Sequence, residues 1–307
     1  MSRRRFIKQV GAGATLLSLA PLKLLAAREE VIKISILHTN DMHSRIECFT
    51  SGRNKGAGGM LQLASVIKQI RSEEENILLL DAGDIFQGTP YFNYYDGELE
   101  FKLMSEMGFD ASTLGNHDFD NGIEGLFKQL PHANFPFLSA NYDVSNTALN
   151  GHTLPNKIFN KNGIKIGVFG LGIELAGLVD PKLYKDTLYI DPIRVANEQS
   201  SLLKNELNCD LVVCLSHLGY SYKSKKVSDR VLAQETANID LIIGGHTHTF
   251  LKKPQILENK EGETVLINQV GFGALKLGKI DFYFEKSTSK KKYESASICV
   301  KNETKFT

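Results

Sequence analysis

Apolar runs of strand length alternate along most of the chain with segments of helical periodicity. The runs predict strands, and they occupy residues 31–37, 77–80, 109–116, 137–140, 211–215 and 239–243. Apolar residues spaced three and four apart predict helices, and these segments are 60–70, 98–107, 123–130, 193–207 and 227–236. Strands that alternate with helices in this way favour an α/β fold of layered sheets flanked by helices.

Turn residues refine this picture at several points. Asn162-Gly163 separates two short apolar runs and predicts a β-hairpin. The aromatic segment 91–95 is expected to be a loop, and Ser228 is expected to cap the helix that follows it. In the last part of the chain, strand-like runs separated by turns suggest an antiparallel meander; they are residues 264–270, 278–284 and 293–300.

The predicted strands end in side chains that commonly bind metal ions. Five strand ends carry them, and the residues are Asp41 and His43, Asp84, Asn116, His217, and His246 and His248. The two i, i+2 pairs would each project to one side of an extended segment. Because loops at strand ends tend to gather at one edge of a sheet, these side chains are expected to converge.

The ligand types narrow the choice of cation. Mixed nitrogen and oxygen ligands suit zinc, manganese, iron or cobalt, whereas calcium prefers oxygen alone. Seven candidates exceed the three or four protein ligands of one zinc, so two divalent metal ions that share Asp84 fit better. Three of the eight histidines fall outside these motifs and are interpreted as structural or surface residues; they are His38, His132 and His152.

His117 directly follows the candidate ligand Asn116. Neighbouring side chains on an extended backbone point in opposite directions, so Asn116 would face a metal ion while His117 faces something else. Asp120 is near enough in sequence to orient the His117 imidazole. The alternative is that Asp118 and Asp120 only cap the following helix.

Together these motifs resemble those of the calcineurin-like metallophosphoesterases, and closely the catalytic domain of the 5′-nucleotidase/UDP-sugar hydrolase family. The matching pieces lie within residues 31–300 and are Asp41-Met42-His43, Gly83-Asp84, the run from Gly115 to Asp120, Ser216-His217 and the run from Gly245 to His248. The resemblance implies a four-layer α/β/β/α sandwich. It also implies that Asp41, His43 and His248 hold one metal ion, that Asn116, His217 and His246 hold the other, and that Asp84 bridges them. His117, oriented by Asp120, would meet the substrate phosphate.

The activity that the resemblance implies is that of a 5′-nucleotidase-type phosphomonoesterase, which releases phosphate from nucleotides by a metal-activated water. The alternatives are a related hydrolase of 2′,3′-cyclic nucleotides, UDP-sugars or sulfur conjugates, or a metal-loaded scaffold subunit that needs a separate substrate-binding partner. Full-length family members continue into a second domain that grips the nucleoside base between aromatic rings. The expected catalytic domain, residues 28–307, does not include that second domain, which a separate polypeptide could supply.

Other residues near the motifs leave two interpretations open. Arg45 and Arg53 either touch an anionic substrate or belong to a surface loop. The aromatic side chains either stack on a substrate or pack in the core and at its rim, and they are Tyr91, Phe92, Tyr94, Tyr95, Phe250 and Phe272.

The N-terminal segment has the composition of an export signal. Arg3, Arg4 and Arg5 precede a short apolar stretch and Ala26-Ala27, a pattern that resembles a twin-arginine signal over residues 1–27 and predicts a periplasmic location without a stable membrane anchor. Removing it takes away five basic and no acidic residues, so 31 basic and 35 acidic residues leave a net charge of −4. Such a chain is not expected to bind nucleic acid.

The cysteines do not suggest a second metal site. Cys48, Cys209, Cys214 and Cys299 lack the close pairs of a zinc cage. An exported protein could form disulfides, and four cysteines allow three pairings, among which the sequence does not choose.

Overall fold

The structure, a computed structural model, describes residues 31–285 and 291–301, so the expected signal at 1–27 lies outside the described residues. The chain divides into two compact units. In described residues, the larger unit comprises 34–282 and 293–301, and the smaller one comprises strand ends at 31–33, 283–285 and 291–292. All the predicted site residues belong to the larger unit.

The first sheet has six described strands in the order β14-β13-β1-β2-β3-β4. Their bounds are β1 Val31–Thr39, β2 Ile77–Asp81, β3 Ala111–Thr113, β4 Phe137–Leu138, β13 Lys276–Glu285 and β14 Lys291–Cys299. The four strands from β1 to β4 pair in parallel. Apolar side chains of helices α2 (Met60–Glu73), α4 (Glu98–Met107) and α5 (Gly122–Gln129) share one buried cluster with β1 and β2.

The second sheet also has six described strands, in the order β11-β12-β10-β9-β7-β6. They are β6 Asn156–Lys161, β7 Ile164–Leu171, β9 Leu211–Ser216, β10 Leu241–Gly244, β11 Gln255–Glu258 and β12 Thr264–Asn268. Helices α7 (Pro192–Ser201) and α8 (Asp229–Glu235) bury apolar residues against β7, β9, β10 and β12.

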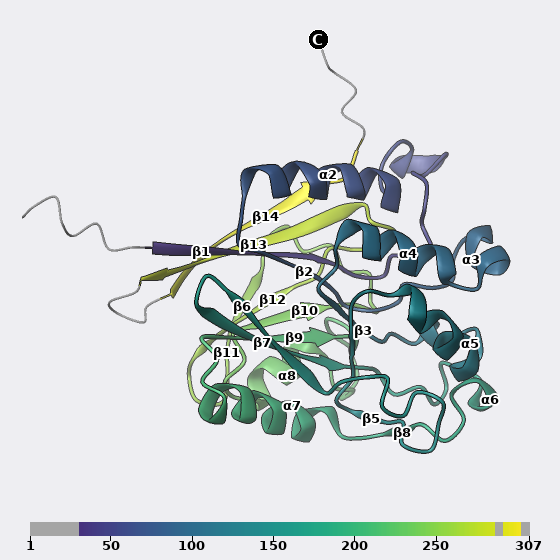
Figure 1. Cartoon of the computed structure of the whole chain (residues 1–307). Helices are drawn as coiled ribbons and strands as arrows, with labels where there is room; N and C mark the ends of the chain where they lie inside the picture. Colours follow the sequence, from purple (N-terminus) through teal and green to yellow (C-terminus); the bar gives the residue numbers. More distant parts are fainter. Residues whose placement is uncertain (1–30, 286–290, 302–307) are drawn as a thin grey trace, which may run out of the picture. The chain divides into compact units, whose positions relative to one another are not determined.

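The two sheets pack on each other through β3 and β4 of the first and β7 and β9 of the second, and the Ala140 amide beyond β4 donates to the Gly170 carbonyl of β7. Figure 1 shows the resulting order of layers: α2 and α4, the first sheet, the second sheet, then α7 and α8. The predicted four-layer α/β/β/α arrangement is confirmed.

Shorter elements lie between these strands and helices in the chain, and they are η1 Gly52–Asn54, α3 Pro90–Tyr95, η2 His117–Phe119, η3 Leu130–His132, β5 Tyr142–Asp143, α6 Pro181–Tyr184, β8 Leu188–Tyr189 and η4 Leu202–Glu206.

Local signals in the sequence explain several of these boundaries. Strands β6 and β7 form the predicted hairpin, with Asn162 at φ 53° and Gly163 at φ 88°, the left-handed conformation that Asn-Gly adopts readily. The Ser228 hydroxyl accepts a hydrogen bond from the Val231 amide and caps α8 as predicted. Asp191 caps α7 in the same way, with Pro192 in its first turn.

Three sequence-based predictions about elements are wrong. Residues 90–95 form helix α3 rather than a loop, because Pro90 starts it and left-handed Asp96 and Gly97 end it. The tail is not a meander: β12 pairs in the second sheet, whereas β13 and β14 lie in the first. Strand β3 ends at Thr113, so Asn116 and His117 lie in a 3₁₀ turn rather than on an extended strand.

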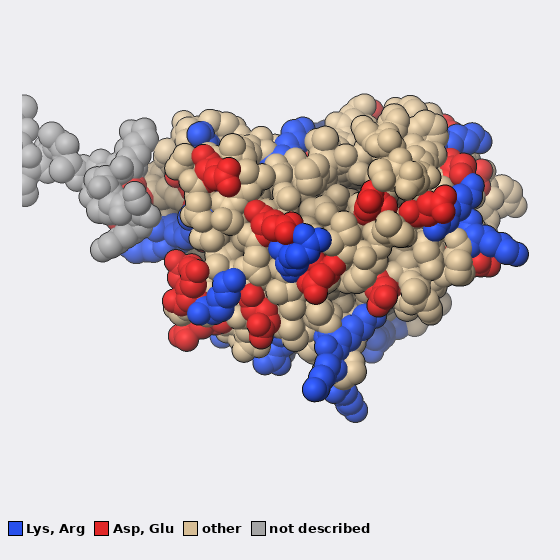
Figure 2. Space-filling model, turned by 90° about the horizontal axis from the view of Figure 1, so that it is seen from below, with Lys and Arg blue, Asp and Glu red and all other residues tan. Residues whose placement is uncertain are grey.

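Helix length and surface charge bear on contact with membranes and nucleic acid. Among the described residues, every helix is too short or too polar to cross a bilayer. On the face shown in Figure 2, basic and acidic side chains are interspersed, so this face offers no continuous basic patch for a phosphate backbone.

Candidate metal centre

Seven predicted ligands meet where the parallel strands of both sheets end. Asp41, Asp84 and Asn116 follow β1, β2 and β3, while His217 follows β9 and the pair His246 and His248 follows β10. The structure brings all seven into one connected set of short contacts. These contacts resolve into two groups, each with ligands from both sheets.

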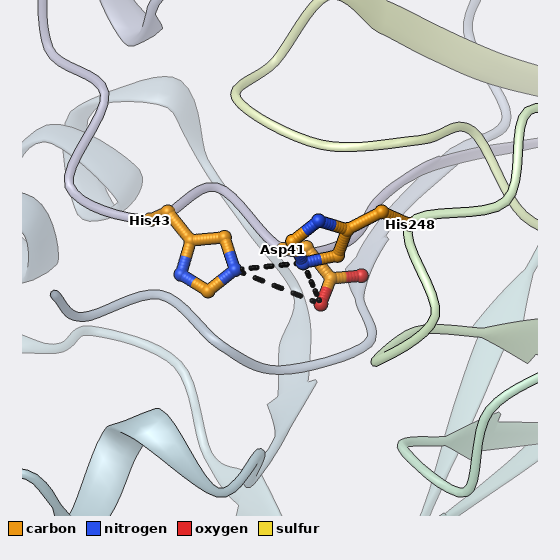
Figure 3. A group of neighbouring side chains, drawn as sticks. All are labelled: Asp41, His43 and His248. Atoms are coloured by element: carbon orange, nitrogen blue, oxygen red, sulfur yellow. Dashed lines mark hydrogen bonds and ion pairs between the residues drawn. The ribbon is translucent and has the colours of Figure 1, made fainter. Parts of the chain in front are cut away.

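The first group consists of Asp41, His43 and His248 (Figure 3). The Nε2 atoms of His43 and His248 lie 2.9 Å apart. Asp41 Oδ1 is 3.3 Å from Nε2 of His248 and 4.0 Å from Nε2 of His43. The Asp41 carboxylate also accepts from the backbone amide of His246, which links this group to the β10 loop.

The second group consists of Asp84, His217 and His246, with Asn116 beside them. Asp84 Oδ2 lies 3.0 Å from Nε2 of His217, and the Asn116 amide oxygen lies 2.8 Å from Nδ1 of His246. The same Oδ2 atom is 3.9 Å from Nε2 of His43 in the first group. Asp84 is therefore the side chain between the two groups.

The surroundings of His217 favour a positive charge at its Nε2 atom. Its Nδ1 donates to the Ala82 carbonyl at 2.7 Å, so in the neutral ring the buried Nε2 has no proton to donate to the Asp84 carboxylate 3.0 Å away. A proton is one way to supply positive charge: burial lowers the pKa of His217, but Asp84 outweighs burial and raises it to about 10. A metal ion bound to both groups is the other way, and the histidine, carboxylate and amide donors fit one.

Two other ligand imidazoles have a lowered pKa, which favours their neutral form. Burial, followed by the positive charge of His217, lowers the pKa of His246 to about 4. Burial is also the largest influence on His43, and it lowers the pKa of this residue. Neutral imidazoles offer the lone pair that a metal ion needs.

The backbone at the ligands is left-handed, which the sequence pattern did not indicate. Five of the seven ligands have positive φ, and the values are 51° at Asp41, 49° at His43, 57° at Asp84, 69° at His246 and 50° at His248. The expectation that the i, i+2 pairs lie on extended segments is therefore wrong, although Asp41 and His43 do meet in one ligand group. Left-handed residues other than glycine are uncommon and cluster at functional sites, because surrounding contacts must hold them there.

His117 lies beside the two groups and is held by Asp120. Its backbone amide donates to Asp84 Oδ1 at 2.8 Å, and its Nδ1 lies 2.7 Å from Asp120 Oδ2. The hydrogen bond with Asp120 is the largest influence on His117 and raises the pKa of the imidazole. Since Nδ1 is engaged and the ring is partly exposed, Nε2 is the atom that can meet a substrate.

Asp118 has a role that the sequence did not reveal. The buried carboxylate accepts from the backbone amides of Asp84 and Gly115 through Oδ2, and from those of Ile85 and Phe86 through Oδ1. It thus fixes the loop that presents Asp84, rather than only capping a helix. In the sequence, the only signal for this role is the position of Asp118 within the motif, because three of its four donors lie more than 30 positions earlier in the chain.

Replacing Asp118 with asparagine should lower the free energy of unfolding by about 2–4 kcal/mol, because the amide nitrogen cannot accept from two of the four buried amides. Urea unfolding of the purified variant measures this loss. Asp120→Asn is the matched control, since its carboxylate is partly exposed and should contribute less than about 1 kcal/mol. Equal stability of Asp118→Asn and the wild type would contradict the role assigned to Asp118.

Gly115 is required by the same close packing. A Cβ atom at this position would overlap Oδ1 of Asp84 and its backbone nitrogen. The glycine lets the loop that carries Asn116 and His117 approach the loop that carries Asp84.

The remaining residues named from the sequence lie outside the two groups. His38 is buried and contacts the Asn268 side chain, while burial lowers its pKa to about 3. Phe92 is buried in the core, and Phe272 stacks on the ring of His248. All four cysteines are unpaired, so none of the three possible disulfide pairings is formed.

Comparison with known proteins agrees with this geometry. The family model for calcineurin-like phosphoesterases matches residues 34–250. The 5′-nucleotidase of Rattus norvegicus is 33% identical over 294 residues, which cover 88% of this chain and 50% of the rat protein. A snake venom 5′-nucleotidase from Crotalus adamanteus is 37% identical over 229 residues, which cover 71% of this chain and 37% of the venom protein.

A solved structure extends the comparison to three dimensions. The 5′-nucleotidase precursor of Thermus thermophilus superimposes with a TM-score of 0.77 and 29% identity, and the match covers 88% of this chain and 55% of that one. The chain thus spans about half or less of the length of these relatives.

Proposed function

Because the chain belongs to the calcineurin-like phosphoesterase family, we propose that it is a metal-dependent phosphoric ester hydrolase, and specifically a 5′-nucleotidase-type phosphomonoesterase. The observation that carries this proposal is the position of Asp84, whose Oδ2 faces His217 of one ligand group and His43 of the other. A carboxylate placed in this way can be shared by two cations. The proposed catalytic domain spans residues 28–307.

The two cations would be held by the two groups. Asp41, His43 and His248 would bind one, Asn116, His217 and His246 would bind the other, and Asp84 would be common to both. Zinc, manganese, iron and cobalt all suit these donors. When bound, such a pair supplies positive charge that activates a water molecule and neutralises phosphoryl oxygens.

The protein's own residues then complete the reaction site. Asp120 holds the His117 imidazole through Nδ1, so that Nε2 can donate to a phosphoryl oxygen or to the oxygen of the leaving group. Asn116, whose amide oxygen faces His246, keeps its loop against the second group. Asp118 fixes the Asp84 loop and so sets the distance between that loop and His117.

Nucleotides are the proposed substrates, since the rat and snake venom relatives are named as 5′-nucleotidases. The test is to load the purified protein with each candidate metal and assay 5′-AMP, 2′,3′-cyclic AMP, UDP-glucose and a thiosulfonate conjugate side by side. We expect phosphate release to be fastest from 5′-AMP. Activity towards the conjugate alone would favour the sulfur-conjugate alternative. If the protein turns over none of the four compounds, the alternative of a metal-loaded scaffold subunit is favoured.

Chelation of the metal ions should abolish phosphate release and lower the melting temperature by several degrees, because a cation that binds only the folded state stabilises it by about 2.7 kcal/mol at 100 times its Kd. Elemental analysis and calorimetry before and after dialysis against a chelator measure both effects. His152→Ala, a change away from the ligands, serves as a control and should respond as the wild type does. A protein that contains no metal and whose melting temperature is insensitive to chelation would contradict the proposal.

We also propose that the protein is exported to the periplasm. The support is the arginine run Arg3-Arg4-Arg5 followed by a short apolar stretch, together with relatives described as venom and precursor proteins. Fractionation of cells that express the tagged chain, with Arg3 and Arg4 intact or replaced by lysine, would test it.

A further inference from the structure

A cavity of about 600 Å³ lies beside the first ligand group. Helix α3 and the chain after His43 form its walls, and its lining includes Arg45, Glu47, Thr50, Tyr91, Tyr94 and Tyr95. This size falls within the range of small-molecule sites, and so does the combination of ring surfaces with a few polar groups. The cavity is separate from the seven ligands, none of which lines it.

Short backbone connections join this cavity to the candidate metal centre. Arg45 follows His43 by two residues, so their Cα atoms are at most about 7 Å apart. The Thr89 hydroxyl on the opposite wall donates to the Ser44 carbonyl at 2.7 Å. The cavity therefore begins close enough to the ligand His43 for the leaving group of a phosphate ester bound at the metal centre to reach it.

Ring contacts make a second connection. The Arg45 guanidinium lies 4.3 Å from the centre of the Phe49 ring. Phe49 meets Phe272 edge-on at 6.0 Å, and Phe272 in turn stacks on His248 at 5.1 Å. A surface of planar groups thus runs from the cavity to the first ligand group.

Two of the three tyrosines of this cavity are exposed. The Tyr94 and Tyr95 side chains are 83% and 50% exposed, although they are large rings on a short helix. Exposed apolar patches occur at ligand-binding grooves and at interaction surfaces. The face of a tyrosine ring stacks on a planar aromatic ring whatever its substituents, and an arginine adds cation–π attraction.

We propose that this cavity binds the planar leaving group of the substrate, a nucleobase or another aromatic ring, while the phosphate lies at the metal centre. The inference rests on the proposed phosphomonoesterase function and names the substrate class of that site. It assigns Tyr94 and Tyr95 to specificity, because they would hold the ring without touching the reacting phosphorus.

The test compares three phosphomonoesters that share the reacting group: 5′-AMP, p-nitrophenyl phosphate and β-glycerol phosphate. In Tyr94→Ala and Tyr95→Ala, KM for the two aromatic substrates should rise roughly 5- to 50-fold, with little change in kcat. KM for β-glycerol phosphate should stay within about twofold of the wild type. Tyr95→Phe should retain most of the selectivity, since it keeps the ring.

Phe127→Ala is the matched control, because it removes a partly exposed ring from helix α5, outside this cavity. Unchanged KM ratios in both tyrosine variants would overturn the assignment and point to a protein partner at these rings. An equal loss for all three substrates would also overturn it, since selectivity would not depend on the rings. A wild type that hydrolyses none of the three would instead refute the proposed function.

Discussion

Replacement of Asp84 by asparagine is expected to reduce phosphate release by roughly 10³–10⁵-fold and to lower the number of bound metal ions. Asp84 Oδ2 faces His217 and His43, while Oδ1 accepts the His117 amide. Asparagine keeps the shape but removes the negative charge between the two groups. The variant therefore loses the shared ligand and the electrostatic partner of a buried imidazole.

Elemental analysis and phosphate release measured on the same preparation test this expectation. Asp186→Asn, which alters an exposed carboxylate, is the control and should keep both values. Two metal ions per chain together with activity within about tenfold of the wild type would rule out Asp84 as the common ligand.

Replacement of His117 by alanine should lower kcat by roughly 10²–10⁴-fold while the metal content stays the same. The contact of His117 with Asp84 is made by the backbone amide, which alanine retains. Only the imidazole, held by Asp120 through Nδ1, is lost. The change therefore separates proton donation from metal binding.

The leaving group provides an internal comparison. If His117 protonates the leaving oxygen, the loss should be smaller for p-nitrophenyl phosphate, whose leaving group needs little protonation, than for 5′-AMP. Asp120→Asn should cause a smaller loss, since it removes only the group that orients the ring. Full activity of His117→Ala on 5′-AMP would show that the imidazole takes no part in the reaction.

Much of this site could be predicted from the sequence because its chemistry follows strand ends. A polar residue just beyond a buried apolar run must lie at a sheet edge, and the parallel pairing of β1 with β2 and of β9 with β10 brings those edges together. That logic selected Asp84 and His217, which come from different sheets and lie 3.0 Å apart.

What escaped prediction depends on contacts that carry no local pattern. Asp118 looked like a helix cap, because its four donors belong largely to a different loop. Helix α3 has only six residues, too few for helical periodicity to appear, so its aromatic segment was predicted to be a loop. The left-handed backbone at His43 and His248 follows from the packing of several loops, whereas side-chain spacing assumes regular strands.

Each ligand group combines residues from both sheets, and this has a consequence for how the centre is acquired. In the first group, His43 and His248 are 205 positions apart in the chain. No early stretch of the polypeptide contains a full ligand set, and a very long loop must close before one exists. Tight binding of a cation is thus expected late in folding, after the two sheets have packed on each other. Neither half of the protein has the ligands to bind the cation tightly alone.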